Sequence, residues 1–488
     1  MIPWIGKNGE EVKKSSIGFF FNLLTKRATW RRGVRDIRPG VFRAYDIRGV
    51  VGEDFDPEWV ACLGRAVGTF FRRKGLTSAV VGRDCRESSP EYEARLAAGL
   101  LSTGVDVIVL HMVPTPVLYY AIKQLGKHAG VMVTASHNPP QFNGFKIWAG
   151  EGTIHTDEIA AIHRIMAAGD FENGRGLLSE HDIRPSYLER VTRDIRLDRP
   201  VSVVVDGGNG AAGLLAAEAL RRAGAEVTPL FCEPDGRFPN HHPDPVVEKN
   251  VGQLAATVRR TGADLGVGLD GDGDRLGVVD EKGNLLFGDR LLALFAREVL
   301  AGHPGATVIG EVKCSHLLYK DIAAHGGVPV MGAAGHSLMK DAMRRTGALL
   351  AGEMSGHLFF ADRYYGFDDA TYAALRLAGI VSRSPVPVSA MLGGWPETVS
   401  TPELRVDCPD AVKFAVVERA VAHFREGHEL VLTDGVRLVF PDGWALLRAS
   451  NTQPALVLRF EADTPARLAE IRRLVEEPLA AWIREAAG

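Results

Sequence analysis

The sequence predicts an α/β protein: three related mixed-sheet α/β domains followed by a smaller α+β domain. From residue 41 to about residue 390, short apolar runs alternate with helical segments, which is typical of sheets flanked by helices. The alternation restarts at residues 201 and 307. After Gly393-Gly394-Trp395-Pro396 it changes to several strands accompanied by two helices. We therefore expect three α/β units and one final domain of different character.

The first unit has the clearest pattern. Residues 59–71 have helical periodicity, and runs of small and β-branched apolar residues predict buried strands. Strands are expected at residues 78–81, 105–110 and 130–133, and further helices at 90–99 and 117–125.

The same criteria apply to the later units. Strands are expected at 201–206, 307–310, 349–352, 430–432, 436–440 and 456–460, with helices in the last domain at 411–424 and 465–481. A Gly-rich turn at 207–210 fits neither a dinucleotide-binding fingerprint nor a P-loop, so it favours a structural turn over a phosphate loop. The expected domains cover residues 41–182, 183–285, 286–396 and 397–488, after an N-terminal extension over residues 1–40.

Composition restricts the class of protein. A chain of 488 residues is too long for one core, and a net charge of -3 gives no reason to expect nucleic acid as a partner. Its five cysteines show no CxxC spacing, which argues against a disulfide framework and a thiolate zinc site and suits the cytoplasm. No run approaches the roughly 20 apolar residues of a membrane span. The segment 17–24 follows basic residues but lacks a cleavage site, so we expect a flexible or self-packed extension, with a membrane-surface segment as the alternative.

A polar loop follows the strand at 130–133. It reads Thr-Ala-Ser-His-Asn-Pro at residues 134–139, and Lys146 comes shortly after it. Because α/β proteins place their chemistry at the carboxyl ends of strands, Ser136 is a candidate nucleophile or phosphate carrier. Lys146 is a candidate for charge or acid/base chemistry, and His137 brings an imidazole. The alternative is a plain polar turn.

Three acids alternate with glycines in Asp270-Gly271-Asp272-Gly273-Asp274, and Arg275 follows them. Carboxylates so crowded would repel one another without a cation, and oxygen ligands from one short loop suit Mg²⁺. The loop lacks the later Glu of an EF-hand. We therefore predict a Mg²⁺ site, with an acidic hairpin turn as the alternative.

Two more polar loops follow strands later in the chain. Glu353 and Ser355 alternate along the backbone and could offer an acceptor and a donor to two neighbouring sugar hydroxyls. In the last domain, residues 448–454 combine a guanidinium, hydroxyls and amides in what reads as one turn, a set that can surround a phosphate. Lys313 and His336 are further candidates on loops of the third unit.

Together these loops resemble the α-D-phosphohexomutase family. The resemblance covers the chain from about Phe42 almost to its end, and pairs the family's phosphoserine, metal, sugar and phosphate loops with residues 134–139, 270–275, 352–357 and 448–454. It implies four domains around a central cleft. Glu-Met-Ser-Gly-His at 353–357 is similar to the branch acting on mannose and glucose phosphates, whereas the glucosamine branch usually has Gln in place of Met354.

The resemblance also implies residue roles. Ser136 would carry the transferable phosphate and contribute to the Mg²⁺ site of Asp270, Asp272 and Asp274. The catalytic residues would be Ser136, His137, Lys146, Arg275 and His336. The substrate would contact Tyr45, Arg48, Lys313, Glu353, Ser355, His357, Arg448, Ser450, Asn451 and Thr452.

The implied activity is that of a phosphohexomutase. It would interconvert the 1- and 6-phosphates of mannose, glucose or both, through a phosphoserine and a hexose 1,6-bisphosphate that acts as intermediate and activator. Partners would be small hexose phosphates, and the protein would be a monomer or weak homodimer. The alternatives are a phosphoglucosamine mutase, a metal-dependent sugar-phosphate phosphatase and a sugar-phosphate-binding regulator without activity.

Overall fold

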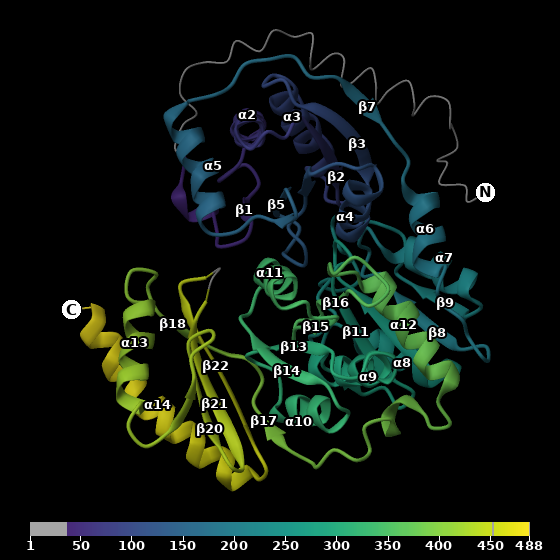
Figure 1. Ribbon diagram of the computed structural model, residues 1–488, viewed down its shortest axis with the longest axis vertical. Helices are drawn as coiled ribbons and strands as arrows, with labels where there is room; N and C mark the ends of the chain where they lie inside the picture. Colours follow the sequence, from purple (N-terminus) through teal and green to yellow (C-terminus); the bar gives the residue numbers. More distant parts are fainter. Residues whose placement is uncertain (1–36, 451–452, 488) are drawn as a thin grey trace. The chain divides into compact units, whose positions relative to one another are not determined.

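The computed structural model describes residues 37–450 and 453–487. The expected N-terminal extension thus lies outside the described residues except for 37–40. The chain forms two compact units, Met1–Arg184 and Pro185–Gly488, and each is described by itself (Figure 1).

The first unit contains one mixed sheet. Parallel pairing joins β2 to β3 and β4, whereas β4 and β5 are antiparallel. Helices α2, α3 and α5 contribute to the main core on one face, and α4 packs against β2 and β4 on the other (Figure 1). The strands, in sheet order, are β1 (Ile47–Val50), β5 (Phe142–Ala149), β4 (Ala129–Val133), β2 (Ser78–Arg83), β3 (Asp106–Met112) and β7 (Leu178–Glu180), with β6 (Gly152–Thr153) beside β5. The helices are η1 (Pro39–Val41), α2 (Pro57–Arg73), α3 (Ser89–Leu101), α4 (Thr115–Gln124) and α5 (Asp157–Ala168).

The second unit begins with another mixed sheet. Its two central parallel strands, β8 and β10, are mostly Val, Leu and Gly, as expected of strands buried on both faces. Helix α8 packs on one face, and α12 of the next sheet contacts both α7 and β11. The elements are α6 (Arg184–Thr192), α7 (Gly213–Ala223), α8 (Gly252–Thr261) and, in sheet order, β12 (Leu285–Leu286), β11 (Leu276–Asp280), β10 (Leu265–Leu269), β8 (Ser202–Asp206) and β9 (Glu226–Leu230).

A third sheet follows. Helix α11 packs on it through Met339 and Met343, while α9 and α10 contact β15 and β14. The elements are β14 (Val328–Gly332), β13 (Thr307–Glu311), β15 (Leu350–Gly352), β16 (Leu358–Phe360), α9 (Gly288–Gly302), α10 (His316–Ala324), α11 (His336–Thr346), α12 (Ala370–Arg383) and η2 (Val388–Ala390).

The first three sheets share one topology. In each, a central strand pairs in parallel with two neighbours, and one of these neighbours turns back through an antiparallel hairpin. The hairpin is β4–β5 in the first sheet, β10–β11 in the second and β15–β16 in the third. The polar loops found in the sequence at Ser136, Asp270 and Glu353 therefore occupy the same place in three repeats.

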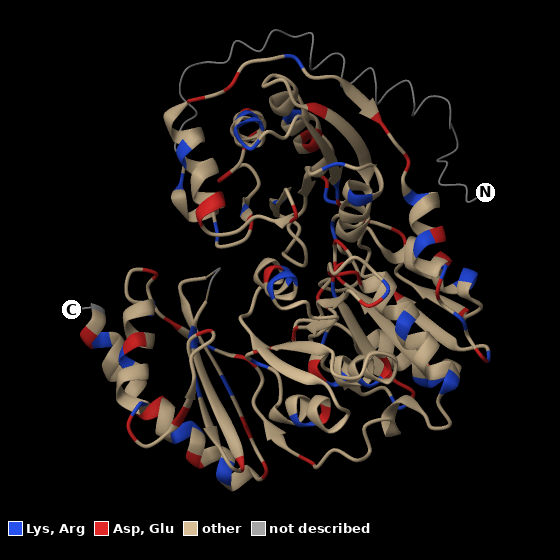
Figure 2. Cartoon of the chain, viewed as in Figure 1, with Lys and Arg blue, Asp and Glu red and all other residues tan. Residues whose placement is uncertain are grey.

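The last sheet is a different, mostly antiparallel layer. Its order is β17-β22-β21-β20-β19 with β18 beside β22, and α13 and α14 cover one face. Acidic and basic residues are interspersed along both helices (Figure 2). The elements are β17 (Val399–Ser400), β18 (Leu404–Asp407), α13 (Lys413–Phe424), β19 (Glu429–Val431), β20 (Val436–Phe440), β21 (Gly443–Ala449), β22 (Ala455–Ala462) and α14 (Pro465–Ala487).

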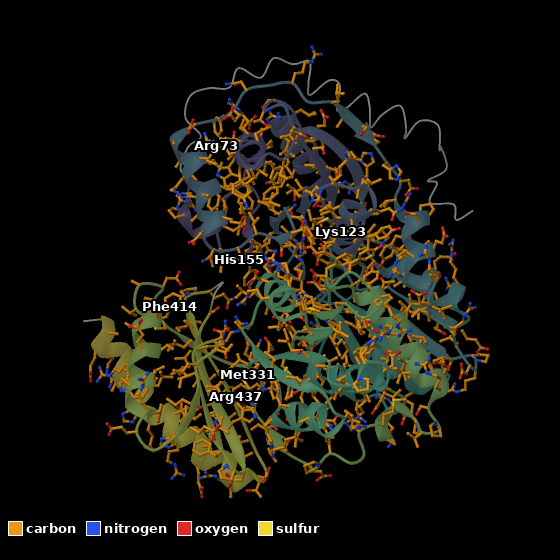
Figure 3. All side chains as sticks on the ribbon, in the orientation of Figure 1. Arg73, Lys123, His155, Met331, Phe414 and Arg437 are labelled. Carbon is orange, nitrogen blue, oxygen red and sulfur yellow. The ribbon has the colours of Figure 1, made fainter. Side chains whose placement is uncertain are left out.

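The opposite face of this sheet packs against the third. Trp444 and Leu446 form a small core with Val312, and Met331 of β14 packs against it. The guanidinium of Arg437 stacks 3.8 Å from the Trp444 ring and donates to the carbonyl oxygens of Val312 and Cys314. Met331 and Arg437 are labelled in Figure 3. The third and last sheets are therefore joined by both apolar and polar contacts.

Several of the observed strands were not predicted, and two of them carry candidate site residues. Residues 142–149 form β5 and residues 443–449 form β21, so Lys146 and Arg448 lie on strands and not in loops. His336 begins α11, whereas the sequence placed it on a loop. Within residues 37–450 and 453–487, no helix has the length and apolar character needed to cross a membrane.

Candidate active site

Ser136 lies in the hairpin between β4 and β5 in an unusual backbone conformation. Its φ angle is 53°, in the left-handed region, and the residue is 1% exposed. This conformation strains a residue with a β-carbon by about 1–2 kcal/mol, and such strain is concentrated at functional sites. The Ser136 N–H donates to Oγ1 of Thr134 at 2.9 Å, and its own Oγ lies 3.2 Å from Nδ1 of His137.

The loop is held by Arg86, which is wholly buried. Its guanidinium donates to the backbone carbonyl oxygens of four loop residues: Ser136 (2.8 Å), Asn138 (2.6 Å), Pro139 (2.7 Å) and Phe142 (3.0 Å). Its Nε also donates to Asp84, at 3.0 Å. One side chain thus fixes the backbone path on both sides of Ser136.

Other predicted residues of the first unit surround this loop. Arg48 donates to Oδ1 of Asn138 at 2.9 Å and pairs with Asp46 at 2.5 Å. Lys146, only 2% exposed, projects from β5 at the position paired with Met132 of β4. Tyr45 lies in the bend that precedes β1.

In the second unit, the hairpin between β10 and β11 brings three buried carboxylates together. Asp270, Asp272 and Asp274 are fully buried, and each offers an oxygen within 4.8 Å of the others. One oxygen of Asp270 accepts backbone N–H groups of Gly273, Asp274 and Arg275. The burial and spacing of these oxygens fit a small, hard cation.

A chain of charged side chains leads from this loop into the third sheet. Arg275 Nε donates to Nε2 of His357 at 3.0 Å. The other ring nitrogen of His357 must then carry the proton, and it lies 2.9 Å from Asp368. Asp368 also pairs with Lys340 at 2.8 Å, and Nδ1 of His336 lies 3.0 Å from that ammonium group.

The pKa values in this cluster indicate which groups stay charged. Burial by itself would raise the pKa of Asp368, but Lys340, His357 and His336 hold it well below its usual range. Burial would lower the pKa of Arg275, but nearby carboxylates, including Asp270 and Asp274, raise it. The cluster therefore keeps its opposite charges.

The hairpin loops at residues 270–275 and 352–357 are directly joined. The N–H of Leu276 donates to the carbonyl oxygen of Gly356 at 3.0 Å, and Arg275 pairs with His357 across the two hairpins. In the second of these loops, Glu353 accepts from the N–H of Gly335 at 2.6 Å, and its other carboxylate oxygen lies 3.4 Å from Oγ of Ser355. Glu353 and Ser355 thus point the same way, as their spacing suggested.

Lys313 lies between two carboxylates whose pKa values are shifted in opposite directions. It is 3.4 Å from Glu311 and 3.0 Å from Glu403, which precedes β18. Burial raises the pKa of Glu311 to about 7, whereas Lys313 and Arg405 overcome the effect of burial and lower the pKa of Glu403 to about 2. Burial would lower the pKa of Lys313, but Glu311 and Glu403 raise it, so Lys313 keeps its charge where the third and last sheets meet.

The predicted phosphate loop joins β21 to β22. Arg448 is the second-last residue of β21, and its Nε donates to Asp434 at 2.9 Å. The same Asp434 oxygen accepts the N–H of Ala334. The buried ammonium group of Lys413 donates to the carbonyl oxygens of Ser450 (2.6 Å) and Gln453 (3.1 Å). Asn451 and Thr452 lie outside the described residues.

Sequence reasoning missed four residues that organise these loops: Arg86, Asp368, Lys340 and Lys413. Each acts on a segment distant in sequence, so no local pattern marks it. What distinguishes them is that they are buried ionisable residues, and burial is known only from the structure. The structure shows the four site loops within their own sheets, and the roles of the site residues stay predictions.

Four family models match successive parts of the chain. They are the phosphoglucomutase/phosphomannomutase alpha/beta/alpha domains I, II and III and the C-terminal domain, at residues 39–173, 185–283, 287–398 and 403–477. The chain belongs to the phosphoglucomutase/phosphomannomutase family. The phosphohexomutase family and the fold class predicted from the sequence are thereby confirmed.

Comparison with individual proteins supports this family assignment. A phosphomannomutase/phosphoglucomutase of Pseudomonas aeruginosa is 46% identical over 443 residues, covering 90% of this chain and 96% of that protein. The crystal structure of a family protein from Burkholderia thailandensis, 44% identical, has a TM-score of 0.86 and covers 92% of this chain and 98% of its own. A probable phosphoglucosamine mutase of Methanothermobacter thermautotrophicus is 35% identical over 467 residues, covering 93% of this chain and 100% of that protein.

Proposed function

We propose that the chain interconverts hexose 1-phosphates and hexose 6-phosphates of glucose, mannose or both, with Ser136 as the phosphate carrier. The similarity to a phosphomannomutase/phosphoglucomutase supports this substrate class over glucosamine phosphates, because the probable phosphoglucosamine mutase is more distant. Met354, in place of the usual Gln of the glucosamine branch, favours the same choice.

One observation carries the proposal: the buried acidic loop is bonded directly to the sugar loop through Arg275 and His357. Phosphoryl transfer needs fixed positive charge and a positioned acceptor more than it needs covalent chemistry. The acidic loop supplies a cation site, and Glu353 and Ser355 supply paired contacts for sugar hydroxyls. The joined hairpins would hold both in a fixed relation.

The donor set fits Mg²⁺. Asp270, Asp272 and Asp274 would hold the ion with carboxylate oxygens, and an oxygen on Ser136 would complete part of its coordination. When bound, such an ion neutralises charge that develops on a phosphoryl group in transfer. The adjacent Arg275 stays protonated and would add positive charge.

The reaction would have two transfers. In the first, the bond between Ser136 Oγ and phosphorus breaks as the free sugar hydroxyl, at O6 or O1, forms a bond to phosphorus, giving a hexose 1,6-bisphosphate. The bisphosphate then turns round. In the second, its original phosphate passes to Ser136 Oγ, which restores the phosphoserine. Lys146 and His137 would take and return the proton of the sugar hydroxyl.

The far phosphate needs its own site. Arg448 and Ser450, with Asn451 and Thr452, would bind it, while Lys313 and His336 would contact the sugar. Lys413 would maintain the loop by holding two of its carbonyl oxygens. The mechanism requires these loops and the Ser136 loop to face one cleft.

The test combines intact-mass measurement with turnover. Wild-type protein incubated with glucose 1,6-bisphosphate should gain the mass of one phosphate, and Ser136→Ala should not. Glucose 1-phosphate and mannose 1-phosphate should be isomerised by the wild type and not by Ser136→Ala. Release of inorganic phosphate without isomerisation would identify a phosphatase, and binding without either product would identify a regulator; both results would overturn the proposal.

A further inference from the structure

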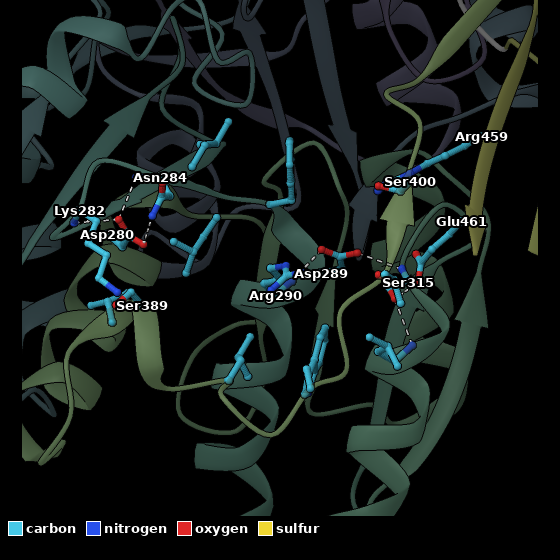
Figure 4. Close-up of a pocket in the computed structure, with 18 residues that line it drawn as sticks. Asp280, Lys282, Asn284, Asp289, Arg290, Ser315, Ser389, Ser400, Arg459 and Glu461 are labelled. Carbon is cyan, nitrogen blue, oxygen red and sulfur yellow. Dashed lines mark hydrogen bonds between the residues drawn. The ribbon is translucent and has the colours of Figure 1, made fainter. Parts of the chain in front are cut away.

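A separate cavity of about 440 Å³ lies within the second unit. Its walls come from four places: the hairpin 280–287 with the start of α9, the start of α10 with Ser315, the segment 388–400, and β22 (Figure 4). None of the residues assigned above to phosphoryl transfer or sugar binding lines it. Its size falls within the range of pockets that bind small molecules.

Arg459 of β22 is the unusual residue of this cavity. It is 8% exposed, yet its Nε has no hydrogen-bond partner among the described residues, and no carboxylate there forms an ion pair with its guanidinium. Figure 4 shows its side chain directed toward Ser400, near Ser315 and Glu461. Glu461 interacts with Arg459 electrostatically but forms no hydrogen bond with it, and the buried Nε–H has lost water without gaining an acceptor, which is costly.

The backbone explains why Arg459 faces the cavity. Leu458 and Phe460 belong to the core beneath α13 and α14, so alternation places Arg459 and Glu461 on the opposite face of the sheet. Arg459 pairs with Leu446, which packs against Val312 of the third sheet. The guanidinium is thus held at the junction of the third sheet, the segment 388–400 and the last sheet.

Acids that line the cavity are already satisfied by the protein. Asp289 accepts the N–H groups of Arg290 and Ser315, and Glu461 accepts the hydroxyl of Ser315 at 2.6 Å. Asp280 similarly accepts donors of its own turn. The basic residues at the cavity have fewer partners. Lys282 and Arg290 are exposed, and neither forms an ion pair within the described chain. Arg290 lies 5.8 Å from the Trp395 ring. The groups of this cavity that still need a partner are therefore hydrogen-bond donors, and an anion would satisfy them.

We propose that this cavity binds the phosphate group of a small molecule, with Arg459 as its principal ligand. The forked guanidinium can donate two hydrogen bonds to a phosphate, with Ser400 beside it and Arg290 at the rim. A bound phosphate would touch Ser400 of β17 and Arg459 of β22, both in the last sheet, and Arg290 in the first turn of α9. It would thereby tie the last sheet to α9, which packs on the third sheet.

Calorimetry with inorganic phosphate tests this directly. The measurements use Arg448→Gln protein, in which the proposed sugar-phosphate site is weakened, so that this second site can be seen. Phosphate should bind, and adding Arg459→Met should weaken binding at least about tenfold, whereas adding Arg467→Gln, an arginine of α14 outside the cavity, should leave it unchanged. Equal affinity with and without Arg459→Met would overturn the proposal.

Two further measurements address a variant that fails to fold and the identity of the ligand. If Arg459→Met does not fold, a crystal of wild-type protein grown with phosphate must show the anion beside Arg459; a cavity filled only by water would overturn the proposal. Glycerol 3-phosphate is the second probe. Tighter binding of this ester than of inorganic phosphate assigns the site to a phosphorylated metabolite, and the reverse order assigns it to free phosphate.

Discussion

The guanidinium of Arg86 donates a 2.8 Å hydrogen bond to the backbone carbonyl oxygen of Ser136, fifty residues further along the chain. Three more carbonyl oxygens of the same loop accept from it, and Asp84 neutralises its charge. The strained conformation of Ser136 is therefore imposed by a buried cation from the end of a neighbouring strand.

Replacing Arg86 should damage both the fold and the reaction. Arg86→Lys keeps the charge, but its three donors cannot reach Asp84 and four carbonyl oxygens, so we expect a loss of about 2–4 kcal/mol in unfolding free energy and at least about tenfold in turnover. Urea unfolding and a mutase assay measure the two effects. Arg73→Lys, which alters an exposed ion pair on α2, should change stability by less than about 0.5 kcal/mol. Equal behaviour of the two variants would show that Arg86 does not hold the loop.

The backbone strain at Ser136 predicts a difference between two inactive variants. Glycine adopts a φ of 53° without penalty, so Ser136→Gly should be about 1 kcal/mol more stable than Ser136→Ala. Ser382 provides the control, because it lies within helix α12, where Ser382→Gly should be less stable than Ser382→Ala. Denaturant unfolding of all four proteins gives the comparison. If alanine were the more stable at both positions, the strain would be absent.

Removal of one carboxylate should weaken the cation site. Mg²⁺ should raise the melting temperature of the wild type, and Asp272→Asn should raise the Mg²⁺ concentration needed by at least about tenfold, which corresponds to about 1.4 kcal/mol. Turnover should fall in parallel. Asp341→Asn, on α11, should respond to Mg²⁺ as the wild type does. Full wild-type turnover in excess chelator would contradict a catalytic metal.

Asp369 should make stability depend on pH. Burial raises its pKa to about 6, although the hydroxyls of Tyr187 and Tyr364 and the N–H of Tyr372 oppose this rise. Because the folded state binds this proton more tightly than the unfolded chain, the stabilisation is present below about pH 4 and is lost as the pH rises through 6. The loss should be on the order of 3 kcal/mol.

Asp369→Asn should remove this component. Between pH 4 and pH 7 the wild type should therefore lose this contribution to its unfolding free energy, and the variant should not. The unfolding free energy of the variant should rise relative to that of the wild type. Asp362→Asn is the useful contrast, because Arg376 overcomes the burial effect and lowers the pKa of Asp362. Parallel stability curves for wild type and Asp369→Asn would contradict a raised pKa.

The four site loops could be found in the sequence because each is a local feature. Where a strand is followed by Thr-Ala-Ser-His-Asn-Pro, or by three acids separated by glycines, the residues that suggest the chemistry lie within six consecutive positions. The alternation of strands and helices gave the fold class for the same reason. The predicted domain boundaries and the roles of individual site residues stay predictions.

Strands β5 and β21 were missed because the segments around Lys146 and Arg448 mix charged and apolar residues. Pairing with Val131 and Leu458 decides their conformation, and these partners lie in other segments. For Lys146 and Arg448, tertiary context outweighed local pattern.

The sequence by itself determined the family, the alternation of elements and the positions of the polar loops, because short-range patterns encode strands, turns and ligand types. Only the tertiary structure decided that three of these loops occupy equivalent hairpins. It also decided that Arg86, Asp368 and Lys340 bind at these hairpins and that Lys413 holds the fourth loop. Such residues act on backbone or charge far along the chain. A buried cation is stable only where acceptors converge on it, and that convergence is a property of the folded molecule.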